Sequence, residues 1–212
     1  MTAFSGLDVE ALSLWRGERM LFRDLAFSVG AGQTLLLEGA NGSGKTSLLR
    51  AIAGFLEPRA GTIRIRMNEG EPLASGEERA NFVGWLGHQD GAKSQLTPIE
   101  ALDFFARYYG GAHTINDALV RVGLARLKDL PIQYLSAGQK RRLALARLTL
   151  TARPLWLLDE PLASLDTAGK ALVADLVGQH CRTGGVAIVA THEPLGLDGA
   201  NPTSRLTLGN SA

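Results

Sequence analysis

The chain has 212 residues, 45% of them hydrophobic, and its 22 lysines and arginines nearly balance its 21 aspartates and glutamates. This length and composition predict one domain with a buried core, and the formal net charge of +1 gives no support for nucleic acid or an anionic membrane surface as a partner. The single cysteine, Cys181, excludes an intramolecular disulfide and a zinc-binding cysteine cluster, so we expect a small buried residue rather than a reactive thiol.

Neither the N-terminus nor any apolar run has the features of a targeting or membrane segment. Residues 1–10 lack a basic region and include two acidic residues, which is unlike a secretory signal. The longest apolar runs, such as residues 186–190, have the length of a strand and fall well short of the ~20 residues that cross a bilayer. We therefore expect a protein that is not exported and that reaches a membrane only through a partner.

The first eighty residues have the pattern of a β-layer. Two or three short strands are expected before residue 30, including residues 7–12 and 25–29, with a turn at residues 16–18. Residues 62–66 alternate in polarity, which favours a half-exposed strand. Residues 67–80 are polar and contain glycine, so we predict a loop there.

A glycine-rich segment at residues 39–46 completes the phosphate-loop pattern G-x-x-x-x-G-K-[ST]. The apolar residues 34–37 before it predict a buried strand, and residues 47–53 after it have helical spacing. Glycine adopts backbone conformations that are closed to other residues, so successive N–H groups can point at phosphate oxygens beside the positive end of the helix. A chance glycine loop would lack these flanks, and the segment predicts binding of a nucleoside triphosphate.

Two residues of this loop have specific expected roles. Lys45 can reach the β- and γ-phosphates, and the Thr46 hydroxyl can bind the Mg²⁺ that bridges them. The residues expected to contact nucleotide here are Gly39, Ala40, Asn41, Gly42, Ser43, Gly44, Lys45, Thr46 and Ser47.

The second half of the chain alternates helical and strand patterns. Residues 82–86 predict a strand, and the pattern from residue 97 to about 150 is helical, beginning with a capping residue, a first-turn proline and an acid. The apolar runs 155–159 and 186–191 are separated by a helix of the length that a right-handed crossover requires. We therefore predict that these two strands are parallel.

Charged side chains follow both of these apolar strands. Asp159 and Glu160 end the first, where Asp159 would hold Mg²⁺ and Glu160 would accept a proton from the attacking water. His192 follows the second and would hydrogen-bond a γ-phosphate. The alternative for the acids is a strand end with two solvated carboxylates. His88 is expected to pack against or support neighbouring residues. The positions of His113 and His180 do not indicate a functional role.

A second helix start with anion-binding character lies at residues 135–139. It offers the Ser136 hydroxyl, the Gly138 backbone and Gln139, yet no strand precedes it. This arrangement suggests that it completes a site built elsewhere, for instance on another subunit. From these residues alone, an ordinary serine-capped helix with a solvated basic face at residues 140–142 is the better explanation of the pattern.

Taken in order, the phosphate loop, Gln89, residues 135–139, residues 157–161, residues 164–166 and His192 resemble the complete motif set of an ABC transporter ATPase subunit. The resemblance implies an α/β P-loop core of ABC type with an N-terminal antiparallel β-subdomain and an inserted helical subdomain at about 90–150, within one nucleotide-binding domain spanning 1–212. It implies two copies that enclose two ATP molecules head to tail.

The same resemblance assigns further roles. Ser136 and Gly138 would contact the γ-phosphate bound to the partner copy, and Asp166 would cross the interface. Gln89 would bind Mg²⁺ and link that site to a membrane subunit, while Lys45, Gln89, Glu160 and His192 would form the catalytic set. Ala137 stands where the family usually has glycine, a change that is tolerable because it adds one methyl group. Trp15 or Arg16 would cover the adenine, since neither position before Gly17 matches the usual aromatic placement.

Finer features resemble the ATPase subunits of cytochrome c maturation, often called haem exporters. These are residues 87–89 with Lys93 and Thr97, the run 135–148, and residues 191–195 on a short chain. This resemblance implies a peripheral protein on the cytoplasmic face of the inner membrane, acting on haem or on a haem-loaded chaperone. The implied membrane partner is the cytochrome c maturation B type, with C and D types as further candidates.

Three alternatives remain open at this point. The chain could serve another ABC exporter, for a drug or a lipid. A soluble ABC ATPase of DNA repair or translation would normally carry a large coiled-coil insertion or a second ATPase domain, and this chain has neither. A nonhydrolytic regulator is disfavoured because Lys45, Asp159 and Glu160 are all present.

Overall fold

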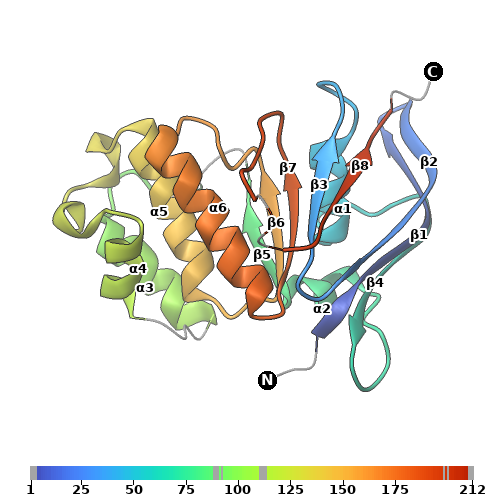
Figure 1. The fold of residues 1–212 in the computed structure, drawn as a ribbon, viewed down its shortest axis with the longest axis horizontal. Coiled ribbons are helices and arrows are strands. Elements are labelled where there is room, and N and C mark those ends of the chain that lie inside the picture. The colour runs from blue at the N-terminus through green and yellow to red at the C-terminus, as the bar shows by residue number, and fades with distance from the viewer. Residues whose placement is uncertain are drawn as a thin grey trace.

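A computed structural model describes residues 4–87, 91, 93–109, 114–197, 199 and 201–209. Figure 1 shows two sheets, with helix α1 between them and the remaining long helices on the outer face of the core sheet. Among the described helices, none has the length and apolar character required to cross a membrane.

The N-terminal sheet is antiparallel, with strand order β2-β1-β4. Its strands are β1 (Phe4–Arg16), β2 (Arg19–Gly30) and β4 (Ala60–Met67), and the β1–β2 hairpin closes at Gly17, which has φ 61°. The expected two or three short strands are thus two long ones. Antiparallel pairing here confirms the predicted N-terminal β-layer.

The core sheet is parallel and has strand order β5-β6-β7-β3-β8. Its strands are β3 (Thr34–Glu38), β5 (Val83–Leu86), β6 (Leu155–Asp159), β7 (Val186–Ala190) and β8 (Thr203–Thr207). The parallel pairing of β6 with β7, which the crossover length predicted, is confirmed. Because all of these strands run in one direction, their carboxyl ends share one edge of the sheet.

Two hydrophobic cores cover the two faces of this sheet. Along β6, Leu155 and Leu157 join the core beneath α1 and the antiparallel sheet, whereas Trp156 and Leu158 join the core beneath the other helices. Successive side chains of a strand point to opposite faces, so a continuous apolar run is what burial on both sides requires.

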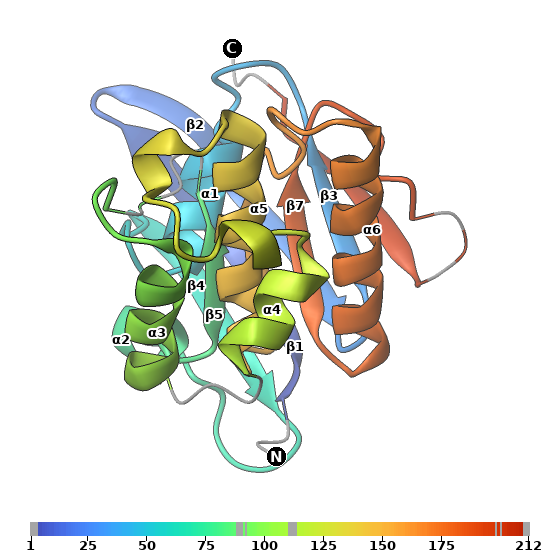
Figure 2. The ribbon, with the colours of Figure 1, turned by 90° about the vertical axis from the view of Figure 1, so that its left-hand side faces the viewer.

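Helix α1 (Lys45–Ile52) follows the phosphate loop, and a helical insert lies between β5 and β6. The insert contains α3 (Pro98–Tyr109), α4 (Ile115–Arg121), two short 3₁₀ helices (Ala125–Leu127 and Ile132–Tyr134) and α5 (Ala137–Leu150). Helix α6 (Thr167–Arg182) is the crossover between β6 and β7. Figure 2 faces these helices and shows α3 and α4 outside α5.

One predicted loop contains regular structure. Residues 67–80 include helix α2 (Gly76–Ala80), and Leu73 forms a β-bridge with Ile65. Ser75 caps α2 by accepting a hydrogen bond from the Glu78 N–H, and the Glu78 carboxylate accepts from the Ser75 N–H in return. The expectation of a loop throughout was therefore wrong, because this local capping box outweighs the polar composition.

Candidate functional site: a phosphate-binding pocket

The glycines of the phosphate loop adopt the left-handed conformations that the sequence predicted. Gly39, Gly42 and Gly44 have φ values of 139°, 79° and 102°. A Cβ atom at Gly39 would lie 2.5 Å from the Leu208 carbonyl oxygen, and one at Gly44 would lie 3.2 Å from the Phe22 ring. Glycine is therefore required at both positions by conformation and by space.

The start of α1 has unused capacity to bind an anion. Gly44 is the N-cap residue of α1 and, having no side chain, cannot cap the first-turn N–H groups itself. The Ser43 hydroxyl is buried and has no hydrogen-bond partner among the residues that the structure describes. A helix N-terminus with a buried orphan donor beside it fits the phosphate groups of a nucleotide.

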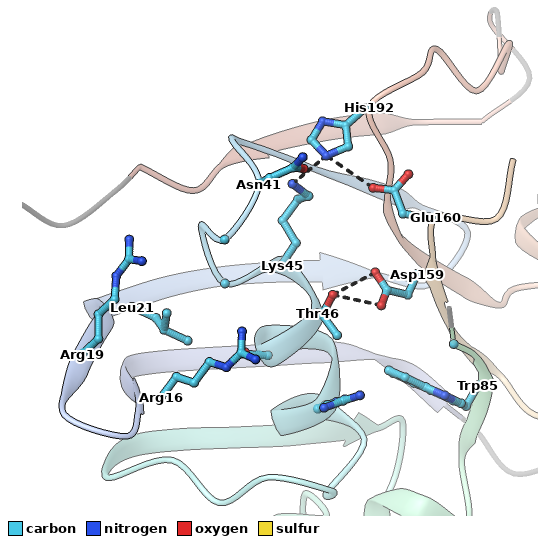
Figure 3. A pocket seen from close by; sticks show the side chains of 15 residues that line it. Arg16, Arg19, Leu21, Asn41, Lys45, Thr46, Trp85, Asp159, Glu160 and His192 are labelled. Atoms are coloured by element: carbon cyan, nitrogen blue, oxygen red, sulfur yellow. Dashed lines mark hydrogen bonds and ion pairs between the residues drawn. The ribbon is translucent and has the colours of Figure 1, made fainter. Parts of the chain in front are cut away.

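Lys45 lies at the centre of this loop and is buried. Its Nζ donates to the carbonyl oxygens of Gly39 at 2.7 Å and Ala40 at 3.2 Å, and it lies 3.2 Å from Nε2 of His192. The ammonium group is thus held inside the curve of the loop (Figure 3). A cation in this position suits the negative charge of β- and γ-phosphates.

Thr46 and Asp159 bring two oxygen donors together at the end of β6. The Thr46 hydroxyl lies 2.9 Å and 3.2 Å from the two carboxylate oxygens of Asp159, which is 4% exposed. Hydroxyl and carboxylate oxygens are the hard ligands that Mg²⁺ prefers, and Mg²⁺ keeps several waters or phosphate oxygens in its shell. Within the described residues no cluster of three or more His, Cys, Asp or Glu side chains could hold a metal ion.

Glu160 and His192 come from neighbouring strand ends and face each other. Nε2 of His192 lies 3.5 Å from Oε1 of Glu160 and 3.2 Å from Nζ of Lys45, so the imidazole lies between a carboxylate and an ammonium group (Figure 3). Glu160 has φ 49°, a left-handed conformation that is rare for a residue with a side chain. Such strain is a reason to examine a residue for function.

These side chains line one cavity of about 650 Å³. The cavity brings together residues from both ends of the sequence, and its lining consists of Arg16, Arg19, Leu21, Asn41, Gly42, Gly44, Lys45, Thr46, Ser47, Arg50, Trp85, Gly87, Asp159, Glu160 and His192. Most of the residues expected around the triphosphate are therefore in one place. Gln89 and His88 lie outside the described residues, as does His113.

Trp15 and Arg16, the two candidates for covering the adenine, differ in position. Arg16 lines the cavity, whereas the Trp15 ring packs against the guanidinium of Arg59 at 5.2 Å. Arg16 therefore borders the cavity, whereas Trp15 is not among the residues that line it. Arg19 also lines the cavity and is paired with Arg16 across the hairpin.

The helix start at Ser136 lies away from this cavity. Ser136 is exposed and caps α5, with the Gln139 N–H donating to its hydroxyl at 3.2 Å. Gly138 approaches the Ser164 carbonyl so closely that a Cβ atom would lie 2.8 Å from it. Asp166 caps α6 and pairs with Arg142 at 2.9 Å. Ser136 is thus exposed, Gly138 packs against Ser164, and neither residue lines the pocket of its own chain.

The pocket or support residues that escaped the sequence analysis include Leu21 and Trp85 and three arginines, Arg19, Arg50 and Arg141. Arg19 was predictable once Arg16 and the hairpin turn were placed, because the two positions are opposite each other. Arg50 lies one turn after Thr46 on α1 and was predictable from helical spacing. Arg141 was counted in a solvated basic face, yet it is 3% exposed.

The fold and the pocket together define an ATPase of the ABC type. Residues 22–163 match the family model described as ABC transporter. A putative ABC transporter ATP-binding protein from Pyrococcus furiosus superposes with a TM-score of 0.80 at 25% identity, covering 96% of this chain and 98% of that one. A dimeric ATP-binding cassette bound to ADP and Pi has the same fold, with a TM-score of 0.79 at 19% identity over 97% of each chain.

Curated relatives indicate which group of ABC ATPases the chain belongs to. The cytochrome c biogenesis ATP-binding export protein CcmA of Rhizobium meliloti is 45% identical over 92% of this chain and 94% of its own length. The CcmA protein of Brucella abortus is 44% identical over 93% and 90%. The chain therefore belongs to the ABC transporter family and, within it, to the CcmA-type ATP-binding subunits of cytochrome c biogenesis.

Proposed function

We propose that the chain hydrolyses ATP in the pocket of Figure 3 and that this hydrolysis drives a membrane complex of c-type cytochrome biogenesis. The observation that supports this most is the convergence of Lys45, Thr46, Asp159, Glu160 and His192, from three separate segments, on one cavity. The chemistry of these groups suits phosphoryl transfer, in which positioning and charge stabilisation supply most of the catalysis.

Within this proposal, the phosphate loop binds the triphosphate and Lys45 stabilises charge on the β- and γ-phosphates. Thr46, Asp159 and Gln89 would hold Mg²⁺, which when bound would neutralise the developing negative charge. The Glu160 carboxylate accepts the proton of the attacking water, and His192 hydrogen-bonds the γ-phosphate. Arg16, together with Arg19, covers the adenine with a planar guanidinium.

We also propose that the chain acts as a single nucleotide-binding domain that pairs head to tail with a second copy. Ser136 is exposed and lies outside its own pocket, which supports a role for Ser136 and Gly138 at the γ-phosphate of the partner copy. Asp166 would then lie at the interface between the copies. The γ-phosphate is enclosed in this way, and shielded from bulk water, only when the two copies have closed.

The proposed membrane partner is a multi-span subunit of the cytochrome c maturation B type, joined by C- and D-type subunits, with Gln89 linking it to the pocket. The chain would then work on the cytoplasmic face of the inner membrane. Its cargo is haem itself or a haem-loaded chaperone. The names of the CcmA relatives support this assignment, and the nearly neutral net charge gives no support for nucleic acid as a partner.

Replacing Glu160 by Gln tests the chemistry of the proposal. The E160Q variant keeps the size of the side chain but cannot accept a proton, so we expect hydrolysis to fall by about 100-fold or more. Binding of ATP, measured by titration calorimetry, should change less than about twofold. Glu193→Gln is the matched control because Glu193 is exposed and pairs with Lys170 outside the pocket lining. Undiminished steady-state hydrolysis by E160Q would refute the role of Glu160.

Co-purification tests the assignment to cytochrome biogenesis. The tagged chain, extracted in mild detergent from cells that make c-type cytochromes, should retain a multi-span membrane protein that mass spectrometry identifies as the B-type subunit. Recovery of a drug- or lipid-exporting membrane subunit instead would show that the ATPase serves a different exporter.

A further inference from the structure

Helix α5 carries a buried arginine that reaches the catalytic end of β6. The Arg141 guanidinium donates to the Asp159 carbonyl oxygen at 2.8 Å and to the Glu160 carbonyl oxygen at 2.5 Å. It also donates to the carbonyl oxygens of Gly87 at 2.7 Å and Pro161 at 3.4 Å. One side chain therefore holds the end of β5 and three consecutive residues at the end of β6.

The backbone at Glu160 requires such support. Its φ of 49° lies in the left-handed region, which is unfavourable for a residue with a side chain. The Glu160 N–H donates to the Ala190 carbonyl at 2.8 Å, and its carbonyl accepts from Arg141. Hydrogen bonds on both sides of the residue thus fix the turn, and the turn sets the direction in which the Glu160 side chain leaves the backbone.

The side chain that leaves this turn is the proposed proton acceptor. Glu160 lines the pocket and its Oε1 lies 3.5 Å from Nε2 of His192, whereas Arg141 is not among the residues that line the cavity. The hydrogen bonds of Arg141 described above all end on backbone carbonyls, so the route from Arg141 to Glu160 that they define runs through the backbone. A displacement of about 1 Å in a reacting group is enough to lower a rate by roughly 100-fold.

We propose that Arg141 is the positioning residue for Glu160 and that it also ties this carboxylate to the Ser136 end of α5. Arg141 stands five residues after Ser136, within the first two turns of the same helix. In the proposed dimer, Ser136 contacts the ATP of the partner copy while Glu160 serves the chain's own ATP. Movement of α5 when one ATP site closes is thereby transmitted to Glu160, the proton acceptor of the other ATP site. This inference rests on the proposed function.

The geometry of the guanidinium makes the inference testable. Only the forked guanidinium has donors at three nitrogens in one plane, so Lys at this position keeps the charge but can satisfy fewer of the four carbonyls. Arg79 provides a matched control, because it is also buried and donates to the carbonyls of Ala51, Ile52, Ile63 and Ala74. It does so at the opposite end of α1 from Lys45 and Thr46.

The experiment compares Arg141→Lys with Arg79→Lys in the full chain. Both variants should lower the thermal midpoint of unfolding, but only Arg141→Lys should lower kcat, by at least about tenfold, while KM for ATP changes less than about twofold. Arg141→Gln, which keeps a planar donor group without charge, should show the same split. A kcat for Arg141→Lys within about twofold of the Arg79→Lys value would overturn the inference.

Two further readouts keep the test decisive. If Arg141→Lys fails to fold by circular dichroism, the same comparison is made with Arg141→Gln. Combining Arg141→Lys with E160Q should lower the residual rate no further than E160Q does alone, since both act on one group. Additive losses would show that Arg141 acts elsewhere.

A wild-type chain without ATPase activity would instead refute the proposed function, whatever the variants do.

Discussion

The hydroxyl of Thr46 donates a hydrogen bond to the Asp159 carboxylate at 2.9 Å and so joins the first turn of α1 to the end of β6. The two residues lie 113 positions apart in the chain. Their contact places the phosphate loop and the acidic strand end in a fixed relation, with Lys45 and Glu160 both directed toward His192 (Figure 3). The proposed mechanism depends on this relation more than on either motif alone.

Removal of the Thr46 hydroxyl should weaken hydrolysis that depends on magnesium. Thr46→Val keeps the shape of the side chain but deletes an oxygen whose hydrogen bond to a charged group is worth about 1.5–3 kcal/mol. We expect kcat at a fixed Mg²⁺ concentration to fall roughly 10- to 100-fold. The magnesium dependence of the rate should shift to higher concentration.

Thr46→Ser is the control for this variant because it retains the hydroxyl. It should keep the magnesium dependence of the wild-type chain. Identical magnesium titrations for Thr46→Val and the wild type would contradict the assignment of Thr46 as a ligand.

The arginine pair in the hairpin should contribute to nucleotide affinity. Arg16→Ala and Arg19→Ala each remove a guanidinium from the cavity wall at a distance from the reacting phosphate. A cation stacked on an aromatic ring is worth about 1 kcal/mol, so we expect KM for ATP to rise roughly fivefold in each variant with kcat unchanged. Steady-state kinetics over a range of ATP concentrations measures both constants.

Trp15→Phe is the matched control, since Trp15 packs on Arg59 rather than lining the cavity. Its KM for ATP should equal that of the wild type. A larger rise in KM for Trp15→Phe than for Arg16→Ala would show that the tryptophan covers the adenine.

His180 should make the stability of the fold depend on pH. Its ring stacks on Trp156 at 4.0 Å, and burial lowers its pKa to about 4 from an ordinary value of 6.5. Between these values the unfolded chain binds a proton that the folded chain does not. The free energy of unfolding therefore decreases as the pH falls through this window, by about 3 kcal/mol in total.

Denaturant titrations at several pH values, with His180→Phe as the comparison, measure this contribution. The variant keeps an aromatic ring against Trp156 but has no group that titrates. It should lose less stability than the wild type between pH 6.5 and 4. Parallel pH profiles for the two chains would be incompatible with a depressed pKa at His180.

Local sequence patterns predicted the elements that carry the pocket residues. The phosphate loop, β6 and the start of α3 were predictable because each depends on neighbouring residues: glycine conformations in the loop, an apolar run in the strand, and a capping box at α3. In that box the Thr97 N–H donates to Glu100 Oε2 at 2.8 Å, as the sequence indicated. The order of motifs then identified the family.

Features that depend on distant residues were not predictable in this way. Strands β1 and β2 are longer than expected because bulges interrupt their alternation, with left-handed φ values at Ala11 and Asp24. Strand β8 is short and mostly exposed, so it lacks the apolar signal of a core strand. Arg141 sits in a basic run that resembles a solvated face, and only the tertiary fold brings four carbonyls to its guanidinium.

The concentration dependence of hydrolysis tests most directly whether a second copy of the chain completes the catalytic site. The rate per chain should rise with chain concentration in the range where sedimentation shows monomers giving way to dimers in the presence of ATP. Ser136→Arg, which places a bulky side chain at the exposed start of α5, should abolish this rise and leave ATP binding intact. A constant rate per chain in samples that sedimentation shows to be monomeric would show that one copy of the chain is enough for hydrolysis.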